Sequence, residues 1–211
     1  YDPATDPPRD GWDGGGYDTI PYICNAKNVM TVGAVNDAVS GGLRDLGKAT
    51  MTSFSSWGPS DDGRVKPDVV ANGSGLWSTY STSDTSYGTL SGTSMSSPNA
   101  AGSAVLLVEL YAKLFSNAVM RASTLKGLIL HTASDIGNAG PDYRFGWGLM
   151  NSEAAARQLL AHERRPDLGR IVEDTVAAGE TNSYAFDWDG TSPIRATLCW
   201  TDPPGEPKNA L

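Results

Sequence analysis

Cysteine and histidine are scarce in this sequence, and their scarcity limits the chemistry that the chain can perform. Its 211 residues include two cysteines, Cys24 and Cys199, which are too few for a disulfide framework and are not spaced as metal ligands. We expect two free, mostly buried thiols and no metal site. The only histidines are His131 and His162. We expect His131 to be a packing or helix-end residue and His162 to lie at the surface.

Long apolar runs and excess positive charge are also absent. The longest apolar runs, 104–108 and 128–130, are far too short to span a membrane. The net charge is −8 and the isoelectric point is about 4.6, which disfavours nucleic acids and anionic membranes as partners. The sequence opens without the pattern of a signal peptide. With 24 glycines, 13 prolines and 19% charged residues, the composition indicates a loop-rich globular protein.

The most informative stretch is Gly92–Pro98, which reads Gly-Thr-Ser-Met-Ser-Ser-Pro and leads into the apolar run 104–108. Glycine permits a sharp turn and proline is tolerated near a helix start, so the pattern predicts a helix that begins close to Ser94. A helix start offers free N–H groups and the positive end of the helix dipole to a developing oxyanion. Ser94 is therefore a candidate nucleophile, and the alternative is an ordinary N-cap serine.

This stretch resembles the serine motif of the subtilisin-like serine proteases, the subtilases. Three other segments have counterparts in that family: 29–35, which ends in Val-Gly-Ala-Val; the Phe-Ser-Ser-Trp-Gly-Pro turn at 54–59; and the Lys-Pro-Asp-Val strand start at 66–69. The resemblance covers most of residues 20–160. It implies a serine endopeptidase that acts on polypeptides and is secreted or otherwise extracytoplasmic.

The resemblance also implies roles for individual residues. Ser94 would form the acyl-enzyme, and its backbone N–H would be one donor of the oxyanion hole. Tyr22, Ile23 and Cys24 lie where the family places one wall of the primary specificity pocket, and their side chains would narrow that pocket. Subtilases commonly bind calcium, but the sequence contains no convincing ligand cluster, and no other cofactor is evident.

Three motifs of the family's active site have no counterpart in the chain. These are the Asp-Ser/Thr-Gly turn, the His-Gly-Thr helix start and the Ala-Gly-Asn turn that supplies an oxyanion donor. We therefore expect a fragment that is inactive alone and whose partners are polypeptide substrates and the missing N-terminal half of its catalytic domain. The alternative is a non-catalytic pseudo-protease or binding module that retains the fold. A different hydrolase that uses His131 or His162 is disfavoured because no Gly-x-Ser-x-Gly elbow occurs.

The resemblance to subtilases implies an α/β fold in the first of two domains, and hydrophobic periodicity places its elements. Residues 1–163 are expected to form the C-terminal part of a subtilisin-like parallel-sheet domain with flanking helices. Its predicted elements are a buried strand within 29–35, a β-ribbon of 76–80 and 87–91, and helices over 94–115, over 123–132 and from an N-cap at Asn151. An incomplete parallel sheet would expose an apolar edge, so we expect this chain to fold well only beside its missing half, or as a nicked or self-associated species.

The second domain, residues 167–211, is expected to be the incomplete start of an all-β, sandwich-like domain. Period-two alternation predicts two strands, one with Tyr184, Phe186 and Trp188 on a shared face and the next with Ile194, Ala196, Leu198 and Trp200 on a shared face. Residues 198–204 resemble part of the β-sandwich that follows the protease domain in some secreted bacterial alkaline subtilases. The few strands that fit into this length cannot close a sandwich.

Overall fold

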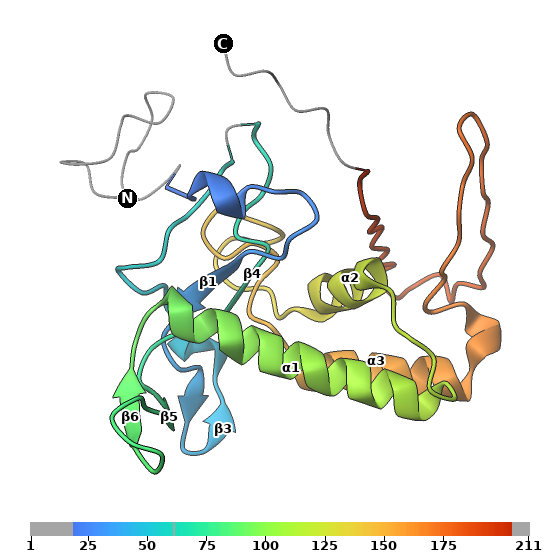
Figure 1. Ribbon diagram of the computed structural model, residues 1–211. Helices are drawn as coiled ribbons and strands as arrows, with labels where there is room; N and C mark the ends of the chain where they lie inside the picture. Colours follow the sequence, from blue (N-terminus) through green and yellow to red (C-terminus); the bar gives the residue numbers. More distant parts are fainter. Residues whose placement is uncertain (1–18, 61, 204–211) are drawn as a thin grey trace.

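Two parallel strands form the centre of the structure. The computed structural model describes residues 19–60 and 62–203. Within these ranges, β1 (Val32–Val35) pairs in parallel with β4 (Val69–Asn72) (Figure 1). Most apolar side chains of both strands are almost completely buried, as their near-continuous apolar sequences predict. The expected parallel sheet with flanking helices is therefore confirmed.

The edge of β1 that faces away from β4 is covered over part of its length. The Ala34 carbonyl accepts hydrogen bonds from the Thr52 N–H at 3.1 Å and from the Thr52 hydroxyl at 2.9 Å. The Ala34 N–H donates to the Ser55 hydroxyl at 3.0 Å. We expected this edge to be open. The polar side chains of the Thr-Ser-Phe-Ser-Ser segment instead satisfy part of its backbone, which reduces its tendency to pair with another chain.

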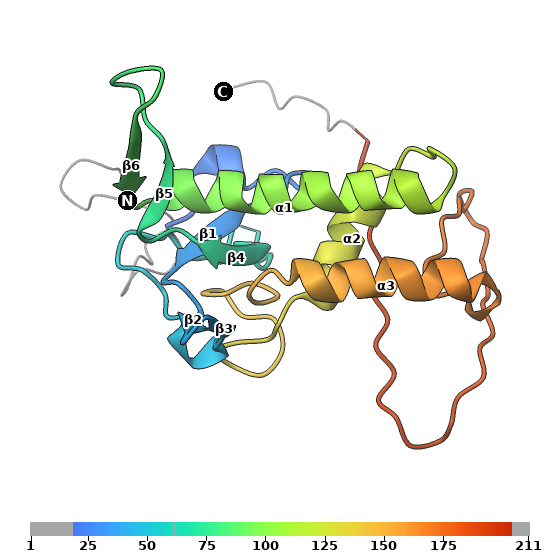
Figure 2. The same cartoon turned by 90° about the horizontal axis from the view of Figure 1, so that it is seen from below.

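One helix packs against the sheet, and two more pack against that helix and against each other. α1 (Thr93–Leu114) lies against β1 and β4, α3 (Ser152–Arg164) runs alongside α1, and α2 (Ala122–Thr132) packs against α3 (Figure 2). All three begin within one residue of the predicted starts, and the Asn151 carboxamide oxygen caps α3 by accepting from the Ala154 N–H at 3.0 Å. None of the helices in the described ranges has the length and hydropathy needed to cross a membrane.

The main hydrophobic core fills the space between these helices and the sheet. Its members that are no more than 5% exposed are Val69, Ala71, Ala100, Leu107, Leu128, Ile129, Ala155 and Leu159. Burial of each large aliphatic side chain contributes about 1.5–3 kcal/mol. The core contains residues of all three helices and of β4, and it therefore fixes the direction in which α1 leaves the sheet.

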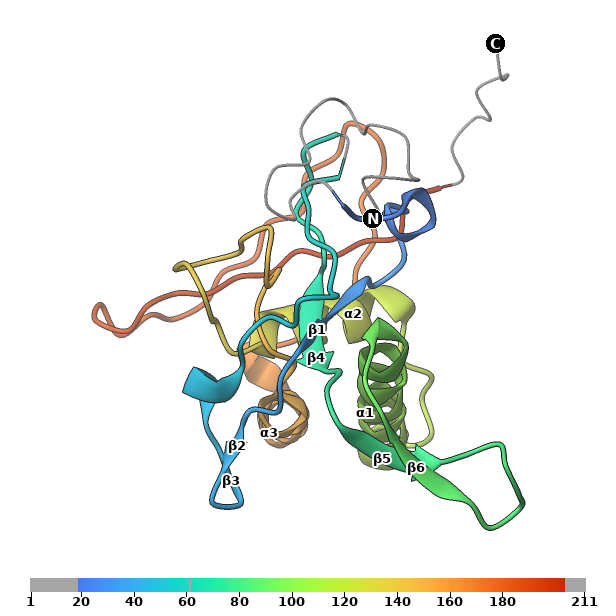
Figure 3. The same ribbon diagram turned by 90° about the vertical axis from the view of Figure 1, so that its left-hand side faces the viewer.

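Two antiparallel ribbons extend from this layer (Figure 3). β5 (Leu76–Thr79) pairs with β6 (Tyr87–Leu90), which confirms the predicted ribbon before Ser94. β2 (Val39–Ser40) pairs with β3 (Leu43–Arg44) and was not predicted from the sequence. Its turn is Gly41-Gly42, with φ angles of 58° and 79° that favour glycine. The signal for this hairpin was present in the Gly-Gly dipeptide.

The chain returns to the sheet through a tight turn before α3. The Asp142 carboxylate accepts hydrogen bonds from the N–H groups of Arg144 and Phe145 at 2.8 and 2.7 Å. Phe145 is 9% exposed and packs in the core, whereas Trp147 is 40% exposed. The Trp147 N–H donates to the Asp68 carbonyl at 2.9 Å, which places the turn directly against the segment that leads into β4.

The strands expected in the second domain do not form. Residues 169–203 contain no strand, and they follow a long excursion that returns along α2 (Figure 1). The predicted faces are solvent-exposed, with Phe186, Trp188 and Leu198 exposed by 63%, 57% and 84%. A strand needs a neighbour to satisfy its backbone groups, and these segments find none within the described residues. The expected start of a β-sandwich is therefore not seen here.

Candidate active site

Ser94 lies in the first turn of α1, where that helix meets the carboxyl ends of β1 and β4 (Figure 1). The Gly92 N–H donates to the Gly73 carbonyl at 2.8 Å and so joins the serine turn to the end of β4. Gly73 is packed so closely that an added Cβ would lie 2.6 Å from the Ala34 Cβ and 2.9 Å from the Gly92 carbonyl oxygen. The missing side chain at Gly73 therefore lets the serine turn seat directly on the sheet.

The environment of Ser94 suits a group that carries developing negative charge. The N–H groups of Met95 and Ser96 are both directed at the Gly92 carbonyl, and the Ser96 hydroxyl donates to the Thr93 carbonyl at 3.0 Å. Among the described residues nothing accepts a hydrogen bond from the Ser94 N–H, and nothing is hydrogen-bonded to its exposed hydroxyl. The positive end of the helix dipole lies at the same place. The Ser94 N–H is thus available to an oxyanion, but no base within residues 19–60 and 62–203 is hydrogen-bonded to its hydroxyl.

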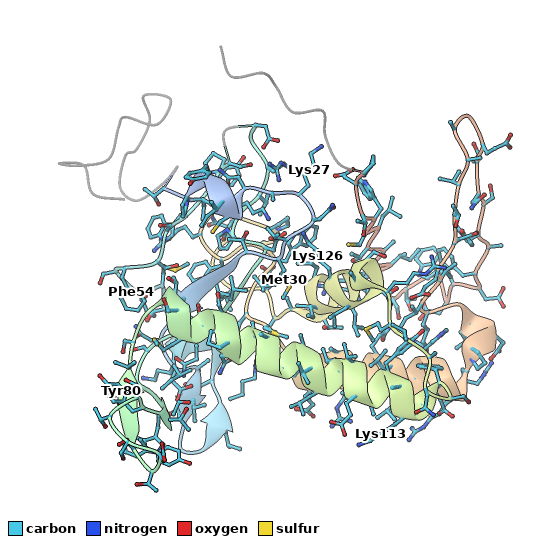
Figure 4. All side chains as sticks on the ribbon, viewed as in Figure 1. Lys27, Met30, Phe54, Tyr80, Lys113 and Lys126 are labelled. Atoms are coloured by element: carbon cyan, nitrogen blue, oxygen red, sulfur yellow. The ribbon has the colours of Figure 1, made fainter. Side chains whose placement is uncertain are left out.

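A mostly apolar hollow of about 400 Å³ opens beside Ser94. Its lining comes from three segments that are far apart in the sequence: Ile20, Pro21, Ile23, Cys24 and Val29–Gly33; Phe54–Ser56 and Pro67; and Thr93, Ser94 and Ser97. Figure 4 shows Phe54 near the N-terminal end of α1 and Met30 farther along the wall. Ile23 and Cys24 line the hollow with Ser94, whereas Tyr22 does not and is 84% exposed. Two of the three proposed wall residues therefore lie beside the candidate nucleophile.

Residues 22–31, which we term the wall segment, are held in place largely by charged side chains. Lys66 is 2% exposed, and its ammonium group lies 2.6 Å from Asp68 Oδ2, 3.2 Å from Thr31 Oγ1, 3.2 Å from the Val29 carbonyl and 3.4 Å from the Ala26 carbonyl. Burial lowers the pKa of Lys66, while the hydrogen bond and the negative charge of Asp68 act in the opposite direction. A buried ammonium group is tolerated here because oxygen atoms surround it.

Lys126 approaches the same carboxylate from α2. Its ammonium group lies 3.1 Å from Asp68 Oδ1 and donates to the carbonyls of Lys27 and Val29 at 3.0 Å each. The Lys66–Asp68–Lys126 cluster therefore links the wall segment to β4 and to α2. Sequence reasoning missed this cluster, although a lysine and an aspartate two residues apart at the start of a buried strand give a usable signal.

Neither histidine is placed to act on Ser94. The His131 Nδ1 lies 3.0 Å from the Thr197 hydroxyl, and burial together with the nearby charge of Arg195 lowers the pKa of His131. His162 packs its ring 5.7 Å from that of Phe115, just beyond the end of α1. Because α1 has 22 residues, Phe115 lies about 30 Å from Ser94.

The expectation of a packing or helix-end histidine fits His131, which lies in the last turn of α2. The expectation of a surface residue is wrong for His162. Its side chain is half-buried and its Nδ1 is shielded from solvent, because the α3 helix that carries it packs along α1. Aromatic packing of this kind cannot be read from the local sequence of α3, since Phe115 is 47 positions away.

The described residues do not fit a calcium site. Across 19–60 and 62–203 no three His, Cys, Asp or Glu side chains gather closely enough to hold a metal ion. Calcium prefers six to eight oxygen ligands, and the oxygen atoms that converge beside Asp68 already surround the Lys66 ammonium group. The two cysteines are free thiols, as expected, but each is only half-buried. Burial raises the pKa of the Cys199 thiol.

Comparisons with known proteins find relatives of one family. A model of the Subtilase family matches residues 10–148. Subtilisin DY of Bacillus licheniformis is 33% identical over 143 residues, which cover 68% of this chain and 42% of that protein. The Serine protease/ABC transporter B family protein tagA of Dictyostelium discoideum is 30% identical over 182 residues, 73% of this chain and 10% of that protein.

The fold is also found among solved structures. The CspB protease of Clostridium perfringens has a TM-score of 0.58 and 24% sequence identity, over 68% of this chain and 29% of that chain. This chain thus spans less than half the length of each of these proteins. The family model nevertheless matches more than half of its residues and includes the serine turn, the wall segment and both central strands. The chain belongs to the subtilase family.

Proposed function

We propose that this chain carries the nucleophile of a serine endopeptidase and that Ser94 is that nucleophile. Its Oγ would attack the carbonyl carbon of a peptide bond while a base takes the hydroxyl proton. The tetrahedral oxyanion would accept a hydrogen bond from the Ser94 N–H. Return of the proton to the leaving amine and collapse of the intermediate would give an acyl-enzyme on Ser94, which water then hydrolyses. The observation that carries this proposal is an exposed helix-start serine with an available N–H beside an apolar hollow.

The base, the acid that orients it and a second oxyanion donor would come from polypeptide outside these 211 residues. Neither His131 nor His162 lies in a position that supports a role as the base. Loss of a single oxyanion donor lowers turnover by about 10²–10³, and loss of the base lowers it further. The isolated chain is therefore proposed to be inactive. Its partners would be polypeptide substrates and the remainder of its own catalytic domain.

The proposed substrate preference follows from the lining of the hollow. Ile23 and Cys24 take up space in its wall, and the rest of the lining is mostly apolar. We assign the hollow to an apolar substrate side chain of small to moderate size. A location outside the cytoplasm is proposed from family membership. The division into a protease part, 1–163, and a separate C-terminal part, 167–211, remains our proposal for the organisation of the chain.

The second candidate is a pseudo-protease or binding module that keeps the fold. The lack of a base beside Ser94 within the described residues favours it. The retained serine turn and the free Ser94 N–H disfavour it, because binding alone places no chemical demand on that serine.

Labelling with a fluorophosphonate probe tests the proposal. We expect no labelling of the isolated chain, and rapid labelling of the complete protein that is lost on Ser94→Ala. Ser97→Ala is the matched control, since Ser97 lies one turn along the same helix and lines the same hollow. Labelling of the complete protein that survives Ser94→Ala would refute the assignment. If the isolated chain is labelled and the labelling is lost on His131→Ala or His162→Ala, the proposal that the base lies outside these 211 residues is refuted.

A further inference from the structure

The wall segment has little backbone pairing of its own. Its regular secondary structure consists of one 3₁₀ turn, η2 (Tyr22–Cys24). The residues that follow, 25–31, form neither helix nor strand before β1 begins. Several of its carbonyl groups instead accept hydrogen bonds from three cationic side chains, two that lie close together just before β4 and one on α2. Arg64 donates to the Asn25 carbonyl at 2.7 Å, and the two lysines of the cluster donate to the carbonyls of residues 26, 27 and 29.

In each of these contacts the donor is a cationic group, and the donor–acceptor distances run from 2.7 to 3.4 Å. Hydrogen bonds in which one partner is charged are in general stronger than those between neutral groups. The Asp68 carboxylate completes the network, because its Oδ2 accepts from the Thr31 N–H at 2.7 Å and its side chain is only 9% exposed. The wall segment is therefore held largely by hydrogen bonds to charged side chains. A strand or helix would instead be held by hydrogen bonds between backbone groups.

Lys126 is the member of the cluster that joins the wall segment to a separate element. Lys66 is two residues from Asp68 and lies shortly before β4, whereas Lys126 reaches over from α2. Figure 4 shows Lys126 beside Met30 and below Lys27, on the side of the wall segment that faces α2. Lys126 donates to the carbonyls of Lys27 and Val29. Val29 lines the hollow, and Lys27 lies two residues before it in the sequence.

We propose that Lys126 is a positioning residue that holds the wall segment at the distance from Ser94 that the hollow needs, and thereby sets its preference among apolar substrate side chains. The inference rests on the proposed protease function. Lys126 touches neither substrate nor Ser94. It acts through the carbonyls of Lys27 and Val29 and through Asp68. Without it the wall segment would sample wider positions, and only the fraction in the narrow position would bind the preferred side chain well.

Lys126→Met tests this role because it removes the charge and keeps most of the side-chain volume. Asp68 remains paired with Lys66 in this variant, so no buried charge is left alone. Lys126→Arg keeps the charge and the donors. Lys113→Met is the matched control: Lys113 is 69% exposed, pairs with Glu109 on the surface and lies at the far end of α1 (Figure 4). Lys126→Gln, which keeps neutral donors, replaces Lys126→Met if that variant does not fold.

The complete enzyme is assayed on peptides that differ in the size of one apolar residue on the acyl side of the cleaved bond. If the narrow position falls to about one tenth of the population, KM for the preferred peptide rises about tenfold. We expect this rise in Lys126→Met, with kcat changed less than about twofold, as for loss of uniform binding. The preference between small and large residues should narrow. Lys126→Arg should restore the KM and the size preference of the parent enzyme. Lys113→Met should have the same KM and the same size preference as the parent enzyme.

Amide hydrogen exchange of residues 26–31 gives a readout that does not depend on catalysis, and it should be faster in Lys126→Met than in Lys113→Met. Equal KM values and equal exchange in these two variants would overturn the inference, as would a fall in kcat with an unchanged KM. A parent enzyme that hydrolyses no peptide and takes up no probe at Ser94 would overturn the proposed function and this inference with it. An active parent with an unaltered Lys126→Met variant would overturn the inference alone.

Discussion

Gly146 is the position at which the packing of the turn before α3 can be tested most directly. Its φ of 63° is unfavourable for any residue with a side chain, and an added Cβ would lie 2.2 Å from the Pro67 carbonyl oxygen and 2.5 Å from the Asp68 carbonyl oxygen. Both obstacles are backbone atoms at the entrance of β4, so they cannot move aside as the end of a flexible side chain could. Gly146→Ala would therefore push the turn away from the sheet.

The expected loss has two parts that a control can separate. A left-handed backbone conformation costs an alanine about 1–2 kcal/mol, and forced overpacking costs a further 1–3 kcal/mol or so. Together they predict that Gly146→Ala lowers the free energy of unfolding by about 2–5 kcal/mol. Gly140 has a φ of 82° and no atom within 4 Å of a built Cβ. Gly140→Ala should therefore lower the free energy of unfolding only by the cost of the left-handed backbone conformation.

Urea unfolding of the two variants and the parent measures the difference. With a typical slope of about 2 kcal/mol per molar urea, a loss of about 3 kcal/mol moves the midpoint by about 1.5 M. The slope itself should stay the same if only stability changes. Equal midpoints for Gly146→Ala and Gly140→Ala would show that the close approach to the Pro67 and Asp68 carbonyls does not constrain this turn, and would refute the reasoning.

Three further predictions concern the core, a helix cap and a surface carboxylate. Leu159→Ala, at a fully buried position, should destabilise the protein by about 2–5 kcal/mol, whereas Val119→Ala, at a position 89% exposed, should change stability by less than about 0.5 kcal/mol in thermal unfolding. Asn151→Ala removes the α3 cap and should lower the unfolding free energy by about 0.5–2 kcal/mol, measured by urea titration. Hydrogen bonds from the side chains of Arg64 and then Ser60 lower the pKa of Asp62 to about 2. Because the folded pKa lies below the unfolded value, the stability difference between the parent and Asp62→Asn should be present above about pH 4 and vanish as the pH falls to about 2; a difference that grows with acid would contradict this.

The elements that the sequence predicted well depend on local patterns. The three helices begin close to where the apolar spacing and the capping residue placed them, and the ribbon before Ser94 forms where alternation and turn residues indicated it. The serine turn itself is readable because glycine, small residues and a proline fix its backbone within a few positions. Such signals need no knowledge of the rest of the fold.

The predictions that failed concern partners far away in the sequence. Period-two alternation at 184–188 and 194–200 is a correct description of the sequence, but no strand forms because no neighbouring strand is present in the described residues. His162 was assigned to the surface because it closes a predicted helix and precedes a linker, and its packing against Phe115 depends on how α3 lies along α1. Ile23 and Cys24 line the hollow with Ser94 and Tyr22 does not, and their role as a wall of the specificity pocket stays a prediction.

The sequence by itself therefore determined the candidate nucleophile, the helix that presents it and the family to which the chain belongs. Only the tertiary structure decided what surrounds that nucleophile. The seating of Gly92 on Gly73, the hollow beside Ser94 and the cluster of Lys66, Asp68 and Lys126 each join segments that are separated by many residues. The physical reason is that helix starts and turns are fixed by neighbouring residues, whereas close backbone approach, burial and buried charge pairing are fixed by which distant segments the fold brings together.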